Sequence, residues 1–202
     1  MDNLHLFALI NAGPGLAGFR LAVAVVLAEW LIYSVPLVMV IAWVRGDRAV
    51  RWALLHLLLA ALVSLCVAQV VAHLWPQPRP FALHLGTQYL EHGNDPGMPS
   101  DHVTVLWSLA LASFGVRRYE VWGLPLLAAG MMVGCSRVYL GVHFPFDVLA
   151  ALPVAALGTV GARALEGPRL PVVSWLLNLY DQLSLRGFSM LRAARKAWAR
   201  RV

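Results

Sequence analysis

Long apolar segments separated by short polar loops dominate the pattern of the chain. A membrane-spanning helix needs about 20 mostly apolar residues, and five segments reach or approach this length. These segments are Leu21–Val44, Trp52–Leu74, Val103–Val116, Val121–Cys135 and Phe146–Arg163. The third and fourth are short, and polar residues at their outer ends extend the helices that they predict. The pattern therefore predicts an all-α integral membrane protein, a bundle of five transmembrane helices.

Both ends of the chain differ from these segments. Leu4–Ile10 is too short to span a bilayer and is followed by a glycine- and proline-containing stretch, so we expect an interfacial helix on the outer leaflet. Near the other end, apolar residues recur at helical spacing before a strongly basic terminus, which favours an amphipathic helix on anionic lipid. These residues are Val173, Leu176, Leu177, Tyr180 and Leu183. A sixth span is the alternative, which Asp181 and Arg186 make costly.

Composition agrees with a membrane protein and divides the chain in two. Of its 202 residues, 60% are hydrophobic and 13% are charged, against about 25% charged in soluble domains. We expect one membrane-embedded domain over residues 1–170 and a basic amphipathic tail over residues 171–202. No internal repeat or low-complexity linker is present in the sequence.

The placement of basic residues predicts the orientation. Three arginines lie between the first two predicted spans, two lie between the third and fourth, and the rest of this group follow the fifth. They are Arg45, Arg48, Arg51, Arg117, Arg118, Arg163, Arg169, Arg186, Arg192, Arg195, Lys196, Arg200 and Arg201. Alternation through five spans puts all of them on one side, and basic loops stay cytoplasmic. We therefore expect the C-terminus to lie inside and the N-terminus outside. The topology accounts for the net charge of +6, so no nucleic-acid partner is expected.

The stretch from Ser136 to Asp147 concentrates charge in an otherwise apolar region. It contains Arg137 and His143. Pro145 begins an apolar run, and proline is favoured in the first turn of a helix, so a helix is predicted to begin near Pro145. An imidazole held by a carboxylate beside a guanidinium suits a nucleophilic or basic histidine that acts on an oxyanion. A membrane helix whose end carries anchoring charges is the simpler alternative.

Two further stretches make that alternative less favourable. Arg79-Pro80-Phe81 follows the second apolar segment, and Pro99-Ser100-Asp101-His102 precedes the third. With Ser136 to Asp147, these stretches resemble the three signature motifs of the type-2 phosphatidic acid phosphatase superfamily, over roughly residues 15 to 165. Asp101 in place of the usual glycine, and residues 91–95, resemble the undecaprenyl-diphosphate phosphatase branch.

This resemblance implies a role for each motif residue. His143 is expected to be the nucleophile, held by Asp147, and His102 the general acid and base. Phosphate oxygens are expected to be bound by Arg79, Ser100, Ser136 and Arg137. No metal or cofactor is expected, because the guanidinium groups supply the positive charge and no Cys/His cluster has metal-ligand spacing.

One position departs from the superfamily pattern. The lysine that should stand seven residues before Arg79 is replaced by Ala72, and the chain's only lysine lies in the basic tail. His73, one position along, is a candidate phosphate donor in its place, although histidine is charged only part of the time near neutral pH. The alternative is that the two arginines suffice.

The expected reaction is hydrolysis of undecaprenyl diphosphate to the monophosphate at the outer face of the bacterial inner membrane, which recycles the carrier lipid for peptidoglycan synthesis. Alternatives are hydrolysis of phosphatidylglycerol phosphate or phosphatidate, and phosphoryl transfer to an acceptor such as lipid A. The expected partners are the polyprenyl diphosphate lipid and the bilayer, and the oligomeric state stays open. Glu29 lies inside the first apolar segment, where a carboxylate is either functional or a packing residue.

Overall fold

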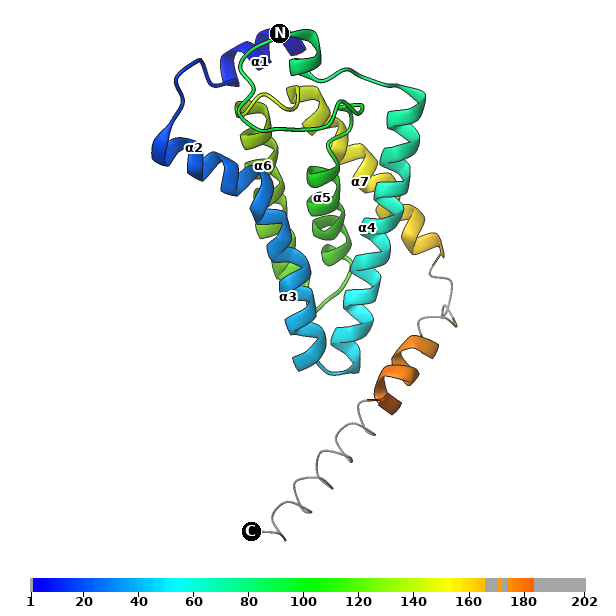
Figure 1. Ribbon diagram of the computed structural model, residues 1–202. Helices are drawn as coiled ribbons and strands as arrows, with labels where there is room; N and C mark the ends of the chain where they lie inside the picture. The colour runs from blue at the N-terminus through cyan, green and yellow to red at the C-terminus, as the bar shows by residue number, and fades with distance from the viewer. Residues whose placement is uncertain (1, 166–170, 172–173, 184–202) are drawn as a thin grey trace, which may run out of the picture.

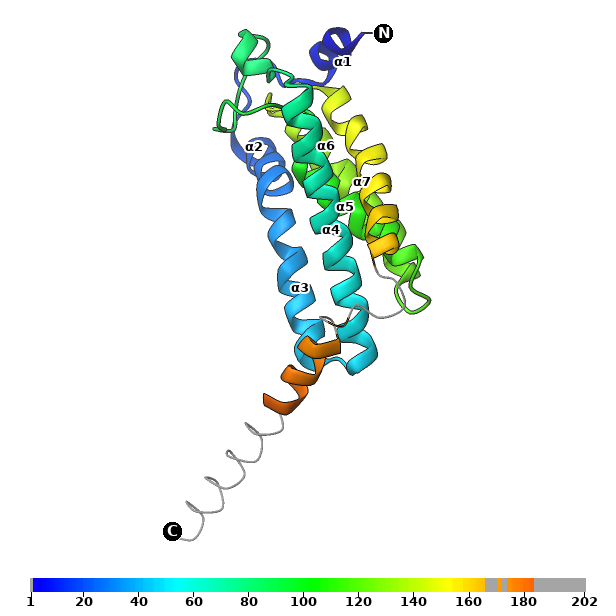
Figure 2. The ribbon, with the colours of Figure 1, turned by 90° about the vertical axis from the view of Figure 1, so that its right-hand side faces the viewer.

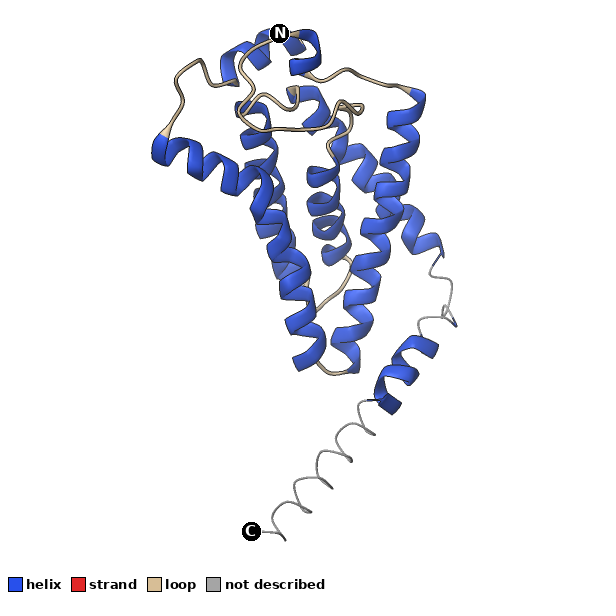
Figure 3. Cartoon of the chain, in the orientation of Figure 1, coloured by secondary structure: helices blue, strands red, loops and turns tan. Residues whose placement is uncertain are grey.

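The computed structural model describes residues 2–165, 171 and 174–183. Every regular element in this part of the chain is helical, as Figure 3 shows. In chain order the elements are α1 (Asn3–Ile10), α2 (Gly18–Val25), η1 (Val26–Trp30), α3 (Leu31–Arg45), α4 (Arg48–Leu74), η2 (Pro80–Leu83), α5 (Asp101–Phe114), η3 (Glu120–Trp122), α6 (Gly123–Tyr139) and α7 (Pro145–Leu165). The predicted class, a helical membrane protein, is confirmed.

Four helical stretches in the described chain are long and apolar enough to cross a membrane. They are Gly18–Arg45, Arg48–Leu74, Glu120–Tyr139 and Pro145–Leu165. The remaining predicted span corresponds to α5, which has 14 residues and is therefore about 21 Å long. That is shorter than the roughly 30 Å hydrocarbon core, so the fivefold crossing stays a prediction.

Helix α5 lies inside the bundle, packed against α4, α6 and α7, and both views of the ribbon place it there (Figures 1 and 2). Its buried face includes Val103, Leu106 and Trp107. Small residues allow close approach of neighbouring helices, as in other membrane bundles. A Cβ at Gly158 of α7 would collide with Ser64 of α4. Helices α4 and α7, which both contact α5, therefore also pack closely against each other.

The chain reverses direction at each end of the bundle, so the loops form two groups (Figure 1). The loops that carry the three motifs gather beside α1, and the turn between α3 and α4 lies at the opposite end. Helix α1 packs on the motif loops through Phe7, whose ring centroid is 5.2 Å from that of Phe144. Asn11 then joins two segments, because its amide donates to the carbonyls of Thr87 at 3.0 Å and Tyr139 at 3.2 Å. The N-terminal helix thus covers the motif end of the bundle.

Residues 174–183 are helical and contact the beginning of α4. Arg48 binds Asp181 at 2.7 Å, and the Arg51 guanidinium lies 4.4 Å from the centre of the Tyr180 ring. A helix is therefore present over the described part of the predicted tail, with Asp181 paired. Its contact with lipid stays a prediction. All basic residues of the predicted tail lie outside the described residues, so the tail as a unit stays a prediction.

Candidate active site

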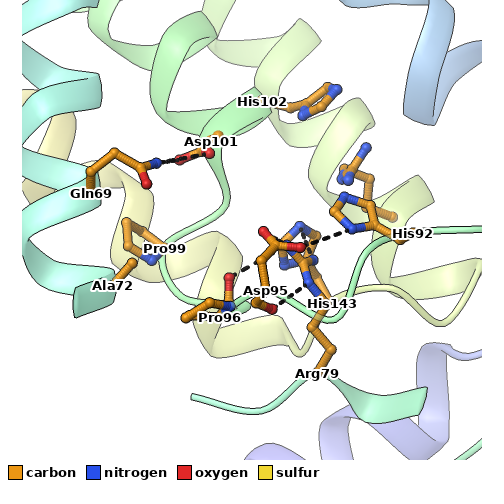
Figure 4. Close-up of a pocket in the computed structure, with 11 residues that line it drawn as sticks. Gln69, Ala72, Arg79, His92, Asp95, Pro96, Pro99, Asp101, His102 and His143 are labelled. Atoms are coloured by element: carbon orange, nitrogen blue, oxygen red, sulfur yellow. Dashed lines mark hydrogen bonds and ion pairs between the residues drawn. The ribbon is translucent and has the colours of Figure 1, made fainter. Parts of the chain in front are cut away.

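A cavity of about 130 Å³ opens between the motif loops and the first turn of α5 (Figure 4). All three sequence motifs contribute side chains to it. Its lining consists of Gln69, Ala72, Arg79, His92, Asp95, Pro96, Pro99, Asp101, His102, Arg137 and His143. Two arginines, three histidines and two aspartates are among these residues, and the guanidinium and imidazole N–H groups are donors suited to a small anion.

His143 is buried in the loop between α6 and α7, and both ring nitrogens have partners. Nδ1 lies 3.2 Å from Oδ2 of Asp147, in the first turn of α7. The same oxygen accepts the Phe144 backbone N–H at 2.8 Å, which fixes the carboxylate. Because a carboxylate accepts, these partners assign the proton to Nδ1 and leave the lone pair on Nε2. Nε2 lies 3.2 Å from Nη1 of Arg79, at the cavity.

Arg79 is almost completely buried and is held along its whole guanidinium edge. Its Nε donates to the Asp95 carbonyl at 3.0 Å, Nη1 to the Val142 carbonyl at 3.0 Å, and Nη2 to Oδ2 of Asp95 at 3.0 Å. The backbone at Gly97 passes close by, since a Cβ there would stand 3.2 Å from Cγ of Arg79. The guanidinium therefore keeps one orientation relative to His143.

Arg137 reaches the cavity from α6 and depends on a distortion in a neighbouring helix. Its Nη1 donates at 3.0 Å to the carbonyl of Ala28, which belongs to the π-helical turn η1. Such turns are frequent at functional sites, since they release backbone groups from the helical ladder. Glu29, in the same turn, is half-buried.

Buried polar atoms near the cavity are left without partners. In the described residues, Nε of Arg137 and Oγ of Ser100 are buried and make no hydrogen bond. Ser100 is the N-cap of α5, where backbone N–H groups and the helix dipole attract an anion. An unpaired buried donor is costly unless a ligand pairs with it. The unpaired Nε belongs to Arg137, which lines the cavity, and therefore points to an anionic ligand that accepts from it.

The electrostatic surroundings keep His143 uncharged. Burial, followed by the positive charges of Arg137 and Arg79, holds the pKa of His143 well below its usual value of 6.5. A neutral imidazole that carries a lone pair on Nε2 is the form that attacks phosphorus.

This pKa shift predicts the acidic side of the pH–rate profile. An ordinary histidine would lose about three-quarters of its neutral form at pH 6, whereas the depressed pKa keeps His143 neutral there. We expect kcat/KM, which reports on the free enzyme, to show no loss as the pH falls from about 7.5 to about 6. Steady-state kinetics across this range check it, and a half-loss centred near pH 6.5 would contradict the neutral-nucleophile assignment.

Comparison with known proteins places this site in a family. The profile of the PAP2 superfamily matches residues 53–168. The chain belongs to the PAP2 superfamily. The resemblance read from the three motifs is thus confirmed.

Individual PAP2 relatives agree with the predicted branch. YbjG of Escherichia coli (strain K12) is 40% identical over 162 residues, which cover 80% of this chain and 81% of YbjG. The undecaprenyl-diphosphatase BcrC of Bacillus subtilis (strain 168) is 29% identical over 163 residues, covering 80% of this chain and 83% of BcrC. The crystal structure of Aquifex aeolicus LpxE shares the fold, with a TM-score of 0.63 at 21% identity, over 80% of this chain and 94% of LpxE.

Most of the predicted PAP2 site residues lie together. His143, His102, Arg79 and Arg137 line the cavity. Asp147 contacts His143 directly at 3.2 Å. Ser100 is buried at the N-cap of α5, and its backbone N–H donates to the Asp147 carbonyl at 3.0 Å. Residues from three separated motifs thus converge on one imidazole.

Two predicted phosphate-binding residues lie elsewhere. Ala72 lines the cavity, whereas His73 is exposed and is not among the lining residues. One residue along a helix turns the side chain by about 100°, so the geometry does not support His73 as the substitute for the motif lysine. Ser136 lines a separate, largely apolar groove with Phe19 and Val23, so direct binding of phosphate by Ser136 is also unsupported.

The exposure of His73 gives a direct prediction. We expect His73→Ala to retain kcat/KM within about twofold, because surface substitutions away from special features have small effects. The pH–rate profile should also be unchanged. A tenfold loss, measured by phosphate release from the purified variant, would restore His73 as a phosphate donor.

Four polar residues at the cavity were missed as site residues from the sequence: Gln69, His92, Asp95 and Asp101. Gln69 of α4 donates to both carboxylate oxygens of Asp101, at 3.2 Å and 3.1 Å, which ties α4 to the first turn of α5. His92 and Asp95 belong to a long loop without periodicity. The only signal for them was the likeness of residues 91–95 to one branch of the family.

Proposed function

We propose that the protein hydrolyses undecaprenyl diphosphate to undecaprenyl phosphate and phosphate, through a phosphohistidine on His143. The observation that carries this proposal is the arrangement of His143, whose Nε2 lies 3.2 Å from Arg79 while Nδ1 lies 3.2 Å from Asp147. The name of the relative BcrC, an undecaprenyl-diphosphatase, supports this choice of substrate.

In the first step, Nε2 of His143 attacks the terminal phosphorus and the bond to the bridging oxygen breaks. Arg79 and Arg137 neutralise the phosphoryl oxygens, which lowers the repulsion that protects a diphosphate from nucleophiles. The imidazole becomes positive as it forms the N–P bond, and Asp147 stabilises that charge through Nδ1–H. The leaving lipid monophosphate takes a proton from His102. Burial, followed by the charge of Arg137, lowers the pKa of His102 to about 3 in the empty cavity, so His102 gains this proton as the diphosphate anion binds.

In the second step, water attacks the phosphohistidine on phosphorus and the N–P bond breaks. His102, now neutral, accepts the proton of the attacking water, which restores its first state. Phosphate leaves and His143 returns to the neutral form. Both steps use only groups that surround the cavity, together with water.

The proposed orientation places the cavity at the periplasmic face of the bacterial inner membrane and the C-terminus in the cytoplasm. Two of the basic loops support it, because Arg48 and Arg118 lie at turns away from the motif loops and bind Asp181 and Asp47 there. Basic loops stay cytoplasmic, and this tendency supports the proposal that the motif loops face outside. A carrier lipid that has delivered its load outside would be dephosphorylated there and recycled for peptidoglycan synthesis.

Phosphate release from purified protein tests the proposal. We expect turnover of C55 diphosphate to exceed that of phosphatidate, to survive excess chelator, and to be inhibited by orthovanadate, which resembles five-coordinate phosphorus. Faster turnover of phosphatidate would identify a different lipid phosphatase. A labelled phosphoryl group that appears on lipid A rather than in solution would indicate a phosphotransferase.

The carboxylate behind His143 gives a further prediction. Asp147→Asn keeps the hydrogen-bond acceptor but removes the charge that stabilises the imidazolium. We therefore expect kcat to fall by about 10²-fold, a smaller loss than in a variant that lacks His143. Asp47→Asn is the matched control, because Asp47 likewise accepts a backbone N–H at the start of a helix, that of Val50 in α4, but lies away from the cavity. If Asp147→Asn is as inactive as a variant without His143, Asp147 does more than support the nucleophile.

A further inference from the structure

A second histidine–aspartate pair faces the same cavity and has no part in the reaction steps above. Nδ1 of His92 lies 3.4 Å from Oδ1 of Asp95, and the other oxygen of that carboxylate binds Arg79 at 3.0 Å. The His92 and His143 rings are 6.3 Å apart between centroids, in edge-to-face orientation. Asp95 therefore links His92 to the arginine that contacts the nucleophile (Figure 4).

The free edge of His92 is available to a ligand. Its Nδ1 is occupied by Asp95 and by the Gly93 carbonyl at 3.2 Å. Both partners accept, which places a proton on Nδ1. Within the described part of the chain, Nε2 of His92 has no hydrogen-bond partner, and the residue lines the cavity. This nitrogen becomes a second donor when the ring is protonated.

The cavity lacks one cation that the family pattern supplies. Ala72 lines it at the position of the motif lysine, and its methyl group offers no charge. His73 is exposed, so the substitute has to come from another element. His92 reaches the cavity from the loop before α5.

We propose that His92, held by Asp95, binds an oxygen of the phosphoryl group under attack and takes the place of the missing motif lysine. This inference rests on the proposed function, since it names a further substrate contact of the same site. Lying beside His143, His92 contacts a non-bridging oxygen of the terminal phosphate. Unlike lysine, it binds phosphate as a cation only after gaining a proton.

The charges around His92 determine how it responds to a ligand. Burial, and then the nearby charge of Arg79, lower the pKa of His92 in the empty cavity. A bound phosphate offsets the positive field and raises that pKa, so binding is coupled to proton uptake and weakens as the pH rises. The titratable and charged groups that face His92 are Arg79, Asp95, Asp101, His102, Arg137 and His143.

A double-mutant cycle between positions 72 and 92 tests the proposal. His92→Ala should lower kcat/KM for C55 diphosphate about 10- to 100-fold at pH 6.5, the range expected for loss of one charged hydrogen bond. Ala72→Lys should recover most of that loss in the His92→Ala background and give little gain in the native protein. His5→Ala, an exposed histidine of α1, is the matched control. Equal gains in both backgrounds, or no recovery, would overturn the proposal.

Binding of inorganic phosphate keeps the test independent of turnover. Calorimetry of detergent-solubilised protein, in buffers of different ionisation enthalpy, measures affinity and proton uptake together. We expect affinity to fall more steeply between pH 6.5 and pH 8.5 in the native protein than in the Ala72→Lys, His92→Ala double variant. Proton uptake that is identical in native protein and His92→Ala would overturn the inference. If C55 diphosphate is not hydrolysed although inorganic phosphate binds normally, the proposed substrate is overturned instead.

Discussion

His143→Ala should lower phosphate release by at least about 10³-fold, since the variant lacks the atom that forms the bond to phosphorus. In the native protein, incubation with ³²P-labelled lipid diphosphate and rapid quenching in alkali should trap a phosphoenzyme. Its lability in acid and stability in base are the properties of phosphohistidine. The variant should show no such label while it still binds orthovanadate.

Folding of this variant has to be shown separately, because His143 is buried beside Phe144 and Asp147. His143→Gln retains a polar side chain of similar size and is the second variant, with the same expected loss. Gel filtration and thermal unfolding in detergent report on the fold. A folded variant that keeps even a few per cent of native activity would show that His143 is not the nucleophile.

The helical fold followed closely from the apolar pattern. Predicted and observed helices agree within a few residues, as for Trp52–Leu74 against Arg48–Leu74, because an uninterrupted apolar run has few other ways to satisfy its backbone in lipid. The π-turn at Val26–Trp30 was not predicted. Its carbonyl at Ala28 binds Arg137, a contact between residues 109 positions apart that no local pattern encodes.

The site was predictable where it depends on short spacing and unpredictable where it depends on loops. His143 and Asp147 are four residues apart around a helix start, so their contact follows from local geometry. Ala72 lines the cavity and His73 does not, because the angular position of a residue at a helix end cannot be fixed from the sequence alone. His92 and Asp95 belong to a long irregular segment, where tertiary contacts such as the Arg79–Asp95 pair decide which side chains reach the cavity.

Arg79→Lys should be almost as damaging as loss of the nucleophile, although it keeps the charge. The native guanidinium uses Nε and both Nη atoms to bind Asp95, Val142 and His143 within 3.2 Å. A lysine ammonium is a point charge on a flexible chain and cannot hold these partners while it also binds a phosphoryl oxygen. We expect kcat/KM to fall by about 10²- to 10³-fold, the range for loss of one preorganised donor to a developing anion.

Arg118→Lys is the matched control for this prediction, because Arg118 is an exposed arginine that also binds an aspartate, Asp47, at 3.2 Å. Its kcat/KM should stay within about twofold of the native value. Thermal unfolding of both variants separates the loss of loop contacts from the loss of phosphate binding. Inhibition by orthovanadate gives the deciding comparison. Because Arg79→Lys lacks the forked donor, its affinity for this transition-state analogue should fall by the same factor as its kcat/KM. If Arg79→Lys stays within tenfold of native activity and vanadate affinity, charge alone suffices at this position and the forked geometry is not what activates the diphosphate.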